Sequence, residues 1–228
     1  MDRSRRLVLG ALPAAALLAA CTTKPGDTAK QAPPSAPDPT TPEDAIAVLM
    51  DGNARFAART PQIRDTASIE ELWQSGIGKK QEPFAMVLGC ADSRLAPELI
   101  FDQFVGDVFV VREAGNIAVS PTNLGSLEYG QAVLGAKALV VLGHSDCGAV
   151  NAAFTASAPG ANIQSIVDAI KPGITGATTL DDAISRNVGA VVEHIRTHSP
   201  MLAEAEKAGA LKIVGAVYNI KTAKVTLL

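Results

Sequence analysis

Residues 138–143 read Ala-Leu-Val-Val-Leu-Gly and are followed directly by His144. Comparable apolar runs occupy residues 84–89, 107–111 and 212–217, and residues 225–228 form a candidate edge strand. Strands that are apolar throughout, rather than on alternate residues, are typical of a parallel sheet that is buried on both faces. These four runs therefore predict the strands of a parallel sheet.

Helical patterns lie between and before the apolar runs. Residues Thr41-Pro42-Glu43-Asp44 have the order of a helix start, with an N-cap residue, a proline at the first helical position and acidic residues in the first turn. The alternation of strand and helix predicts an α/β fold in which helices flank a mainly parallel sheet. The other candidate helices lie near residues 97–104, 123–135, 148–156, 162–170 and 181–197.

Composition sets limits on the class of protein. A chain of 228 residues with 47% hydrophobic residues is long enough for one substantial domain with its own core. The formal net charge is −3. Binding to nucleic acid requires a basic face, so we expect no nucleic-acid partner.

The first twenty residues have the pattern of an export signal. A short basic region is followed by an apolar run over residues 7–20, which is too short to span a bilayer and ends in small residues. Leu18-Ala19-Ala20-Cys21 resembles the lipobox of bacterial lipoproteins, in which the cysteine becomes lipid-modified, and residues 4–9 weakly resemble a twin-arginine export motif. The alternative is an ordinary cleaved signal with an incidental Cys21. We expect a membrane-anchored lipoprotein that faces the periplasm or the cell exterior.

Residues 21–42 are rich in proline and precede the domain, which we expect over residues 43–228. Such a segment is extended, at roughly 3 Å per residue, and builds no core. It is therefore predicted to be a spacer between the membrane and the domain.

Two cysteines and one histidine form the candidate metal site. Cys90 directly follows the first apolar run, His144 directly follows the third, and Cys147 comes three residues later. Ligand sites in open α/β sheets form beyond the carboxyl ends of the strands, so these side chains are expected at one edge. Three protein ligands with a fourth position left open are typical of catalytic zinc.

A disulfide between Cys90 and Cys147, or two inert thiols, is the alternative, and export makes a disulfide reasonable. This alternative does not explain why His144 stands at the end of a strand three residues before Cys147. It also leaves Asp92 and Arg94 without a role.

Two motifs carry a family resemblance. Cys-Ala-Asp-Ser-Arg at 90–94 and Gly-His-Ser-Asp-Cys-Gly at 143–148 resemble the paired signatures of the β-carbonic anhydrases. Residues 111–116, 126–129 and 215–218 are similar to other segments of that family, in the expected order. The resemblance covers roughly residues 41–228.

The resemblance implies the reversible, zinc-dependent hydration of carbon dioxide to bicarbonate and a proton. Cys90, His144 and Cys147 would hold one Zn²⁺ per chain, and zinc-bound hydroxide would attack the substrate. Asp92 would accept a hydrogen bond from that hydroxide, and Arg94 would keep Asp92 ionised. In some family members the aspartate instead ligates the zinc, and this sequence is compatible with both arrangements.

The resemblance also implies a substrate pocket and a partner. Gln81, Phe109, Tyr129 and Gly148 match pocket positions of the family, and the alternative for Phe109 and Tyr129 is that they are plain core residues. Family members are dimers or larger and form the pocket at the interface, so we expect at least a homodimer. The alternative functions are a hydrolase of carbon disulfide or carbonyl sulfide on the same scaffold, and a non-catalytic envelope protein.

His194 and His198 lie four residues apart on a predicted helix, which is a possible ligand spacing. No third ligand is evident in the sequence. We therefore expect these histidines to lie on a solvated helix face.

Overall fold

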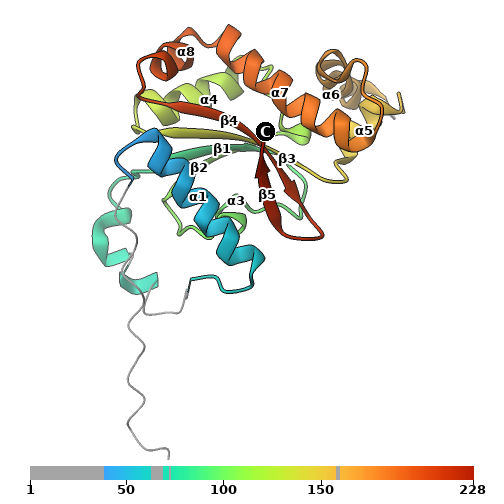
Figure 1. The fold of residues 1–228 in the computed structure, drawn as a ribbon. Helices are drawn as coiled ribbons and strands as arrows, with labels where there is room; N and C mark the ends of the chain where they lie inside the picture. Colours follow the sequence, from blue (N-terminus) through green and yellow to red (C-terminus); the bar gives the residue numbers. More distant parts are fainter. Residues whose placement is uncertain (1–38, 63–68, 72, 158–159) are drawn as a thin grey trace, which may run out of the picture. The chain divides into compact units, whose positions relative to one another are not determined.

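A five-stranded sheet forms the centre of the computed structural model, which describes residues 39–62, 69–71, 73–157 and 160–228 (Figure 1). The strand order is β2-β1-β3-β4-β5. The pairs β1–β2, β1–β3 and β3–β4 are parallel, and β5 is antiparallel to β4. This confirms the predicted α/β fold. The strands are β1 (Ala85–Gly89), β2 (Val108–Arg112), β3 (Ala138–His144), β4 (Lys212–Asn219) and β5 (Lys224–Leu227).

Helices cover both faces of the sheet (Figure 1). Helices α1 (Pro42–Ala57) and α3 (Pro97–Ile100) share one core with the strands. Helices α4 (Pro121–Ala132), α7 (Leu180–His198) and α8 (Pro200–Lys207) contribute to a second core. The remaining helical elements are η1 (Trp73–Ile77), η2 (Ala114–Asn116), α5 (Gly148–Phe154), α6 (Ala161–Ile170) and η3 (Lys171–Ile174).

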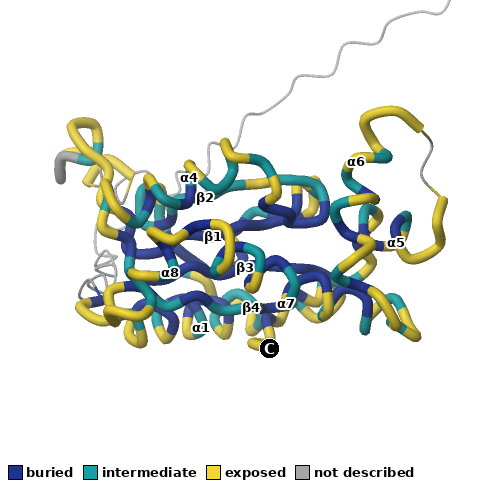
Figure 2. Tube along the Cα trace, turned by 90° about the horizontal axis from the view of Figure 1, so that it is seen from above, coloured by how far each residue is buried: buried dark blue, intermediate teal, exposed yellow. Residues whose placement is uncertain are grey.

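The two cores explain why the strands are apolar throughout. Successive side chains of a strand point to opposite faces of the sheet. Val140 and Leu142 of β3 accordingly belong to the core with α1, whereas Leu139 and Val141 belong to the core with α7. Strands β1 and β3 are buried along their length (Figure 2).

Helix α1 begins as the sequence predicts. The side chain of Thr41 accepts a hydrogen bond from the backbone N–H of Asp44, and the Asp44 carboxylate accepts one in return from the backbone N–H of Thr41. This capping box satisfies two backbone donors that a helix start otherwise leaves unpaired. Pro42, assigned to the end of the linker, is thus the first residue of the helix.

The predicted signal peptide over residues 1–20, Cys21 and most of the proline-rich linker lie outside the described residues. None of the helices in the described part of the chain combines the length and apolar character that a membrane span requires.

Helix α3 is shorter than the predicted segment 97–104 and ends at Ile100. Asp102 lies just beyond it with a φ of 50°, in the left-handed region. Its carboxylate is fully buried and accepts a hydrogen bond of 2.6 Å from Nε of Arg55 on α1. The turn that follows α3 is therefore held to α1 by the ion pair between Asp102 and Arg55.

Candidate metal centre

Cys90, His144 and Cys147 lie together at the carboxyl edge of the sheet. Cys90 directly follows β1, His144 is the last residue of β3, and Cys147 directly precedes α5. Strands β1 and β3 are parallel neighbours in which Gly89 pairs with Leu142, so their carboxyl ends meet. One ligand atom from each of the three residues lies within 4.8 Å of the other two, and all three side chains are buried.

The imidazole of His144 shows which of its nitrogens is available to a metal ion. Its Nδ1 lies 2.9 Å from the carbonyl oxygen of Ser145, so a proton on Nδ1 completes a hydrogen bond. Its Nε2 is buried and has no hydrogen-bond partner. A buried nitrogen without a partner is costly, whereas a bound metal ion makes use of its lone pair. His144 therefore fits a metal ligand that binds through Nε2.

The two cysteines are free thiols rather than a disulfide. A hydrogen bond with Cys147 lowers the pKa of Cys90 to about 4, whereas the hydrogen bond with Cys90 and burial raise the pKa of Cys147 far above its ordinary value. A metal ion would bind both sulfurs as thiolates, so its binding would release protons from the pair. Two sulfurs and one imidazole nitrogen are a donor set that suits Zn²⁺.

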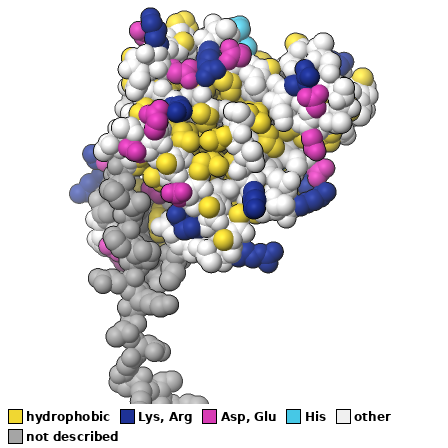
Figure 3. Space-filling view, viewed as in Figure 1, with side chains coloured by type: hydrophobic (Ala, Val, Ile, Leu, Met, Phe, Trp, Pro, Cys, Tyr) yellow, Lys and Arg dark blue, Asp and Glu magenta, His cyan; other side chains and the backbone are white. Residues whose placement is uncertain are grey.

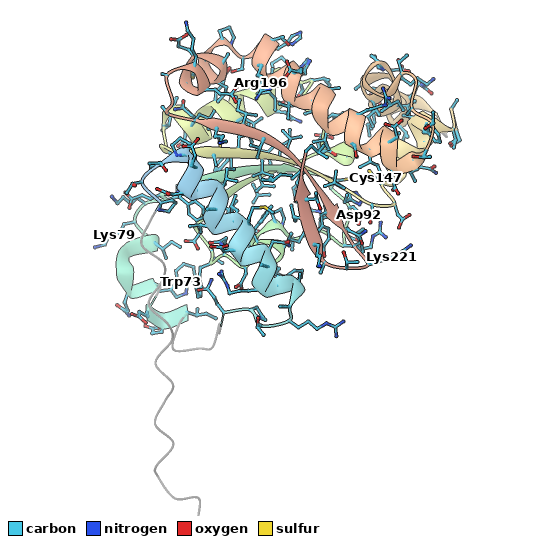
Figure 4. All side chains as sticks on the ribbon, in the orientation of Figure 1. Trp73, Lys79, Asp92, Cys147, Arg196 and Lys221 are labelled. Carbon is cyan, nitrogen blue, oxygen red and sulfur yellow. The ribbon has the colours of Figure 1, made fainter. Side chains whose placement is uncertain are left out.

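Asp92 lies beside the three candidate ligands and forms a bidentate pair with Arg94. Nε of Arg94 donates to Oδ1 over 2.9 Å, and Nη2 donates to Oδ2 over 2.7 Å. These hydrogen bonds hold the pKa of Asp92 well below its usual range, although burial opposes them. Oδ2 of Asp92 lies 4.0 Å from Nε2 of His144. The ionised carboxylate thus lies beside the candidate metal site, near Cys147 (Figure 4).

Arg112, at the end of β2, belongs to the same site, although the sequence assigns it no role. Its Nε donates to the carbonyl oxygen of Cys90 over 3.0 Å, and its Nη2 donates to the carbonyl oxygen of Asp92. Arg112 pairs with Gly89 in the β1–β2 register, which places its guanidinium against the loop after β1. The only sequence signal was its place in the family-like segment 111–116.

Comparison with known proteins supports this geometry. The sequence model of the family described as carbonic anhydrase matches residues 85–225. Carbonic anhydrase 2 of Mycobacterium tuberculosis is 38% identical over 197 residues, which cover 82% of this chain and 93% of that protein. The structure of the Coccomyxa β-carbonic anhydrase in complex with acetazolamide superposes with a TM-score of 0.63 at 27% identity, covering 80% of this chain and 86% of that chain. The chain belongs to the β-carbonic anhydrases.

The fold is shared more widely within this family of carbonate dehydratases. The structure of a tetrameric β-carbonic anhydrase from the ascomycete Sordaria macrospora superposes with a TM-score of 0.65 over 81% of this chain and 97% of that chain. At 22% identity this likeness is one of fold. The family model and the 38% identical relative confirm the predicted membership of the family.

Three predicted pocket residues of this carbonic anhydrase do not reach the metal site within one chain. Gln81 precedes β1, whereas Cys90 follows it, so a five-residue strand about 17 Å long separates them. Phe109 pairs with Met86 near the amino end of β1. Tyr129 of α4 lies against Phe109, with ring centroids 6.3 Å apart, and is 46% exposed. Phe109 thus packs partly into the core and Tyr129 does not.

Gly148 is the one predicted pocket residue that lies at the site. It follows Cys147 directly, is the first residue of α5 and is exposed. A Cβ atom added at this position would meet no atom within 4 Å. The space beside its backbone is therefore open.

His194 and His198 stack on each other on α7, with ring centroids 3.9 Å apart. They line a pocket of about 350 Å³ together with Glu128, Val119, Pro121 and Leu124. Burial and the neighbouring His198 lower the pKa of His194, which favours its neutral form. His198 is exposed, as predicted for a solvated helix face, whereas His194 is partly buried.

Proposed function

We propose that this β-carbonic anhydrase catalyses the reversible hydration of carbon dioxide with one Zn²⁺ held by Cys90, His144 and Cys147. The observation that carries the proposal is the convergence of two thiols and a buried, unpartnered imidazole nitrogen at one sheet edge. When bound, zinc supplies a nucleophile at neutral pH by acidifying a water molecule. The rest of the chemistry follows from what the neighbouring side chains do.

Asp92 is the group that orients the reacting water. An ionised carboxylate accepts hydrogen bonds and does not donate them, so it fixes the direction of an O–H group beside it. Arg94 keeps Asp92 ionised through two side-chain hydrogen bonds. Because both oxygens of Asp92 are bonded to Arg94, the carboxylate is held beside the candidate ligands rather than among them. This favours the open arrangement of the site.

Gly148 offers a substrate contact. Its backbone N–H belongs to the first turn of α5, where the N–H groups have no helical partner. Carbon dioxide becomes a bicarbonate anion as it reacts, so an unpaired N–H next to the metal ligand Cys147 stabilises the charge that develops on an oxygen.

A homo-oligomer would complete the pocket. Gln81, Phe109 and Tyr129 gather toward the amino end of β1, away from the metal site of their own chain, so these pocket positions would serve the site of a partner subunit. Exposed apolar side chains support association, since Tyr129 of α4 and Val133, which directly follows α4, are both exposed. Hydrophobic side chains also gather between α1 and α7 (Figure 3), and Leu227 of the edge strand β5 is exposed. The Sordaria macrospora relative is a tetramer.

The export signal and lipobox at Cys21 place the enzyme, in this proposal, in the cell envelope as a membrane-anchored lipoprotein. The proline-rich residues that follow Cys21 would act as the spacer. Metabolic labelling with a radioactive fatty acid tests this part separately. Label in the wild-type chain and none in Cys21→Ser supports the anchor, and equal label in both contradicts it.

The deciding experiment measures stopped-flow carbon dioxide hydration and zinc content on one sample of the full-length chain. About one zinc per chain with rapid hydration supports the proposal. If the chain holds zinc and turns over carbon disulfide or carbonyl sulfide but does not hydrate carbon dioxide, its substrate is one of these sulfur analogues. A chain that holds no zinc overturns the proposal and leaves a non-catalytic envelope protein.

A further inference from the structure

Gly115 connects helix α7 to the Cys90 thiol. Its backbone N–H donates to Sγ of Cys90 over 3.3 Å. Its carbonyl oxygen accepts a hydrogen bond of 2.9 Å from Nδ2 of Asn187, a residue of α7 that is 72 positions away in the sequence. Both hydrogen bonds are buried. A continuous chain of contacts therefore leads from Asn187 to a candidate metal ligand.

The turn that carries Gly115 has little room to adjust. Gly115 has a φ of 76°, a left-handed conformation that glycine adopts without strain. A Cβ atom at this position would lie 2.7 Å from Cδ1 of Ile170. The N–H that bonds to Cys90 belongs to the peptide unit before Gly115, and the carbonyl held by Asn187 belongs to the unit after it, so the two hydrogen bonds constrain the turn from both sides.

Asn187 is unusual on the face of α7 where it lies. Its neighbours on that face, Ala183, Ile184 and Val191, are buried apolar residues, and Asn187 itself is only 2% exposed. Burial of an amide is costly without a hydrogen bond, and leucine has the higher helix propensity. Core packing alone would therefore favour leucine at this position. The hydrogen bond to the Gly115 carbonyl oxygen offsets the cost of burying the amide.

We propose that Asn187 is a positioning residue of the metal centre, acting through Gly115 to hold the Cys90 thiolate in the geometry of a ligand. The inference rests on the proposed function, because it requires a metal ion at Cys90. A hydrogen bond to a ligand sulfur orients the ligand and offsets part of its negative charge, and residues behind the ligands typically change metal affinity by 10- to 100-fold.

The test is the rate at which the zinc-loaded protein releases zinc to an excess of chelator. In Asn187→Leu the side chain keeps its approximate size and loses the donor, so Gly115 is free to turn away from Cys90. We expect release to be about 10-fold faster than in the wild type. The cobalt-substituted variant should also show an altered cobalt–thiolate absorption band, which a purely structural role would not change.

Asn53→Leu is the matched control. Asn53 is another buried asparagine, 3% exposed, and it belongs to α1. Its side chain donates to the carbonyl oxygens of Ile100 and Ala223 and accepts from the backbone N–H of Val225. The control should lose stability and still release zinc at the wild-type rate.

Two outcomes would overturn the inference in distinguishable ways. A wild type that binds zinc, with Asn187→Leu releasing it at the same rate and showing the same cobalt band, makes Asn187 a structural residue only. If Asn187→Leu does not fold, the smaller Asn187→Ala is measured in the same way against the same criterion. A wild type that binds no zinc removes the proposed function, and the inference falls with it.

Discussion

Arg94 donates to both carboxylate oxygens of Asp92, at 2.9 and 2.7 Å, while the carboxylate lies 4.0 Å from Nε2 of His144. The pair thus has two functions at once. The guanidinium keeps the carboxylate ionised, and its fork fixes the plane in which the carboxylate faces the metal site. A lysine at position 94 would supply the charge without that plane.

Asp92→Asn should retain zinc and lose about 100-fold or more in hydration rate, the range typical when one preorganised hydrogen-bonding group of an active site is removed. The amide can donate a hydrogen bond toward the reacting oxygen and so misorient it, whereas the carboxylate can only accept. Stopped-flow hydration and zinc analysis on one sample measure both effects. Asp51→Asn, at an exposed position of α1, is the control that should change neither. Full activity in Asp92→Asn would refute the role given to the dyad.

Cys147→Ser should lose zinc and hydration together, because a serine hydroxyl stays protonated and is a poor zinc ligand. Cys21→Ser makes the same chemical change outside the domain and should keep one zinc per chain. Elemental analysis of both purified variants is the measurement. Equal zinc content in the two variants would exclude Cys147 from the ligand set.

Arg112→Met should weaken zinc retention and hydration by roughly 10-fold each. The variant keeps the length of the side chain but removes the two hydrogen bonds that hold the backbone of Cys90 and Asp92. Arg186→Met, on the surface of α7, removes an exposed ion pair with Asp182 and should have almost no effect. If the two variants behave alike, the bonds from Arg112 do not organise the site.

Acid should weaken the connection between α7 and α8. Hydrogen bonds from Arg196 lower the pKa of Glu206 below its ordinary value of 4.5. The stabilisation is complete above the pKa of the unfolded chain and is lost as the pH falls through the lower folded-state pKa. At pH 7 the free energy of unfolding of Glu206→Gln should therefore be about 1 kcal/mol lower than that of the wild type. Urea titrations should show this gap closing below pH 4.5, and a gap independent of pH would contradict the assignment.

Tyr129→Glu should shift the protein toward a monomer and reduce hydration, because a charge on the exposed part of α4 opposes burial against a partner. Sedimentation velocity and hydration assays at the same concentration test this. Met201→Glu changes an equally exposed apolar residue of α8 and serves as the control. An oligomer that persists in Tyr129→Glu with full activity would exclude α4 from the interface.

The strands and the three candidate ligands could be predicted from the sequence because their signals are local. An apolar run that ends on a cysteine or a histidine indicates both a strand and the edge at which it ends. Helix α8 was not predicted, because Ser199-Pro200 directly follows α7 and reads as its end. Ser199 in fact serves both helices, as the C-cap of α7 and as the N-cap of α8, where it accepts a hydrogen bond from the backbone N–H of Leu202.

The residues around the ligands could not be predicted, because their partners are backbone groups far away in the sequence. Arg112 finds the carbonyl groups of Cys90 and Asp92 only after β1 and β2 have paired. Asn187 finds Gly115 across 72 positions. The nine-residue spacing between Gln81 and Cys90 likewise does not show where the two side chains lie. Only the presence of β1 between them shows that they lie at opposite ends of that strand.

The pairing of β1 with β3 also governs when the metal can bind. Cys90 and His144 come together through two strands that are separated by β2 and α4 in the chain, so an unfolded polypeptide contains no complete set of ligands. Parallel pairing over such a separation forms late, because a long loop must close first. We therefore expect zinc to bind after the chain has folded, from the compartment in which folding takes place.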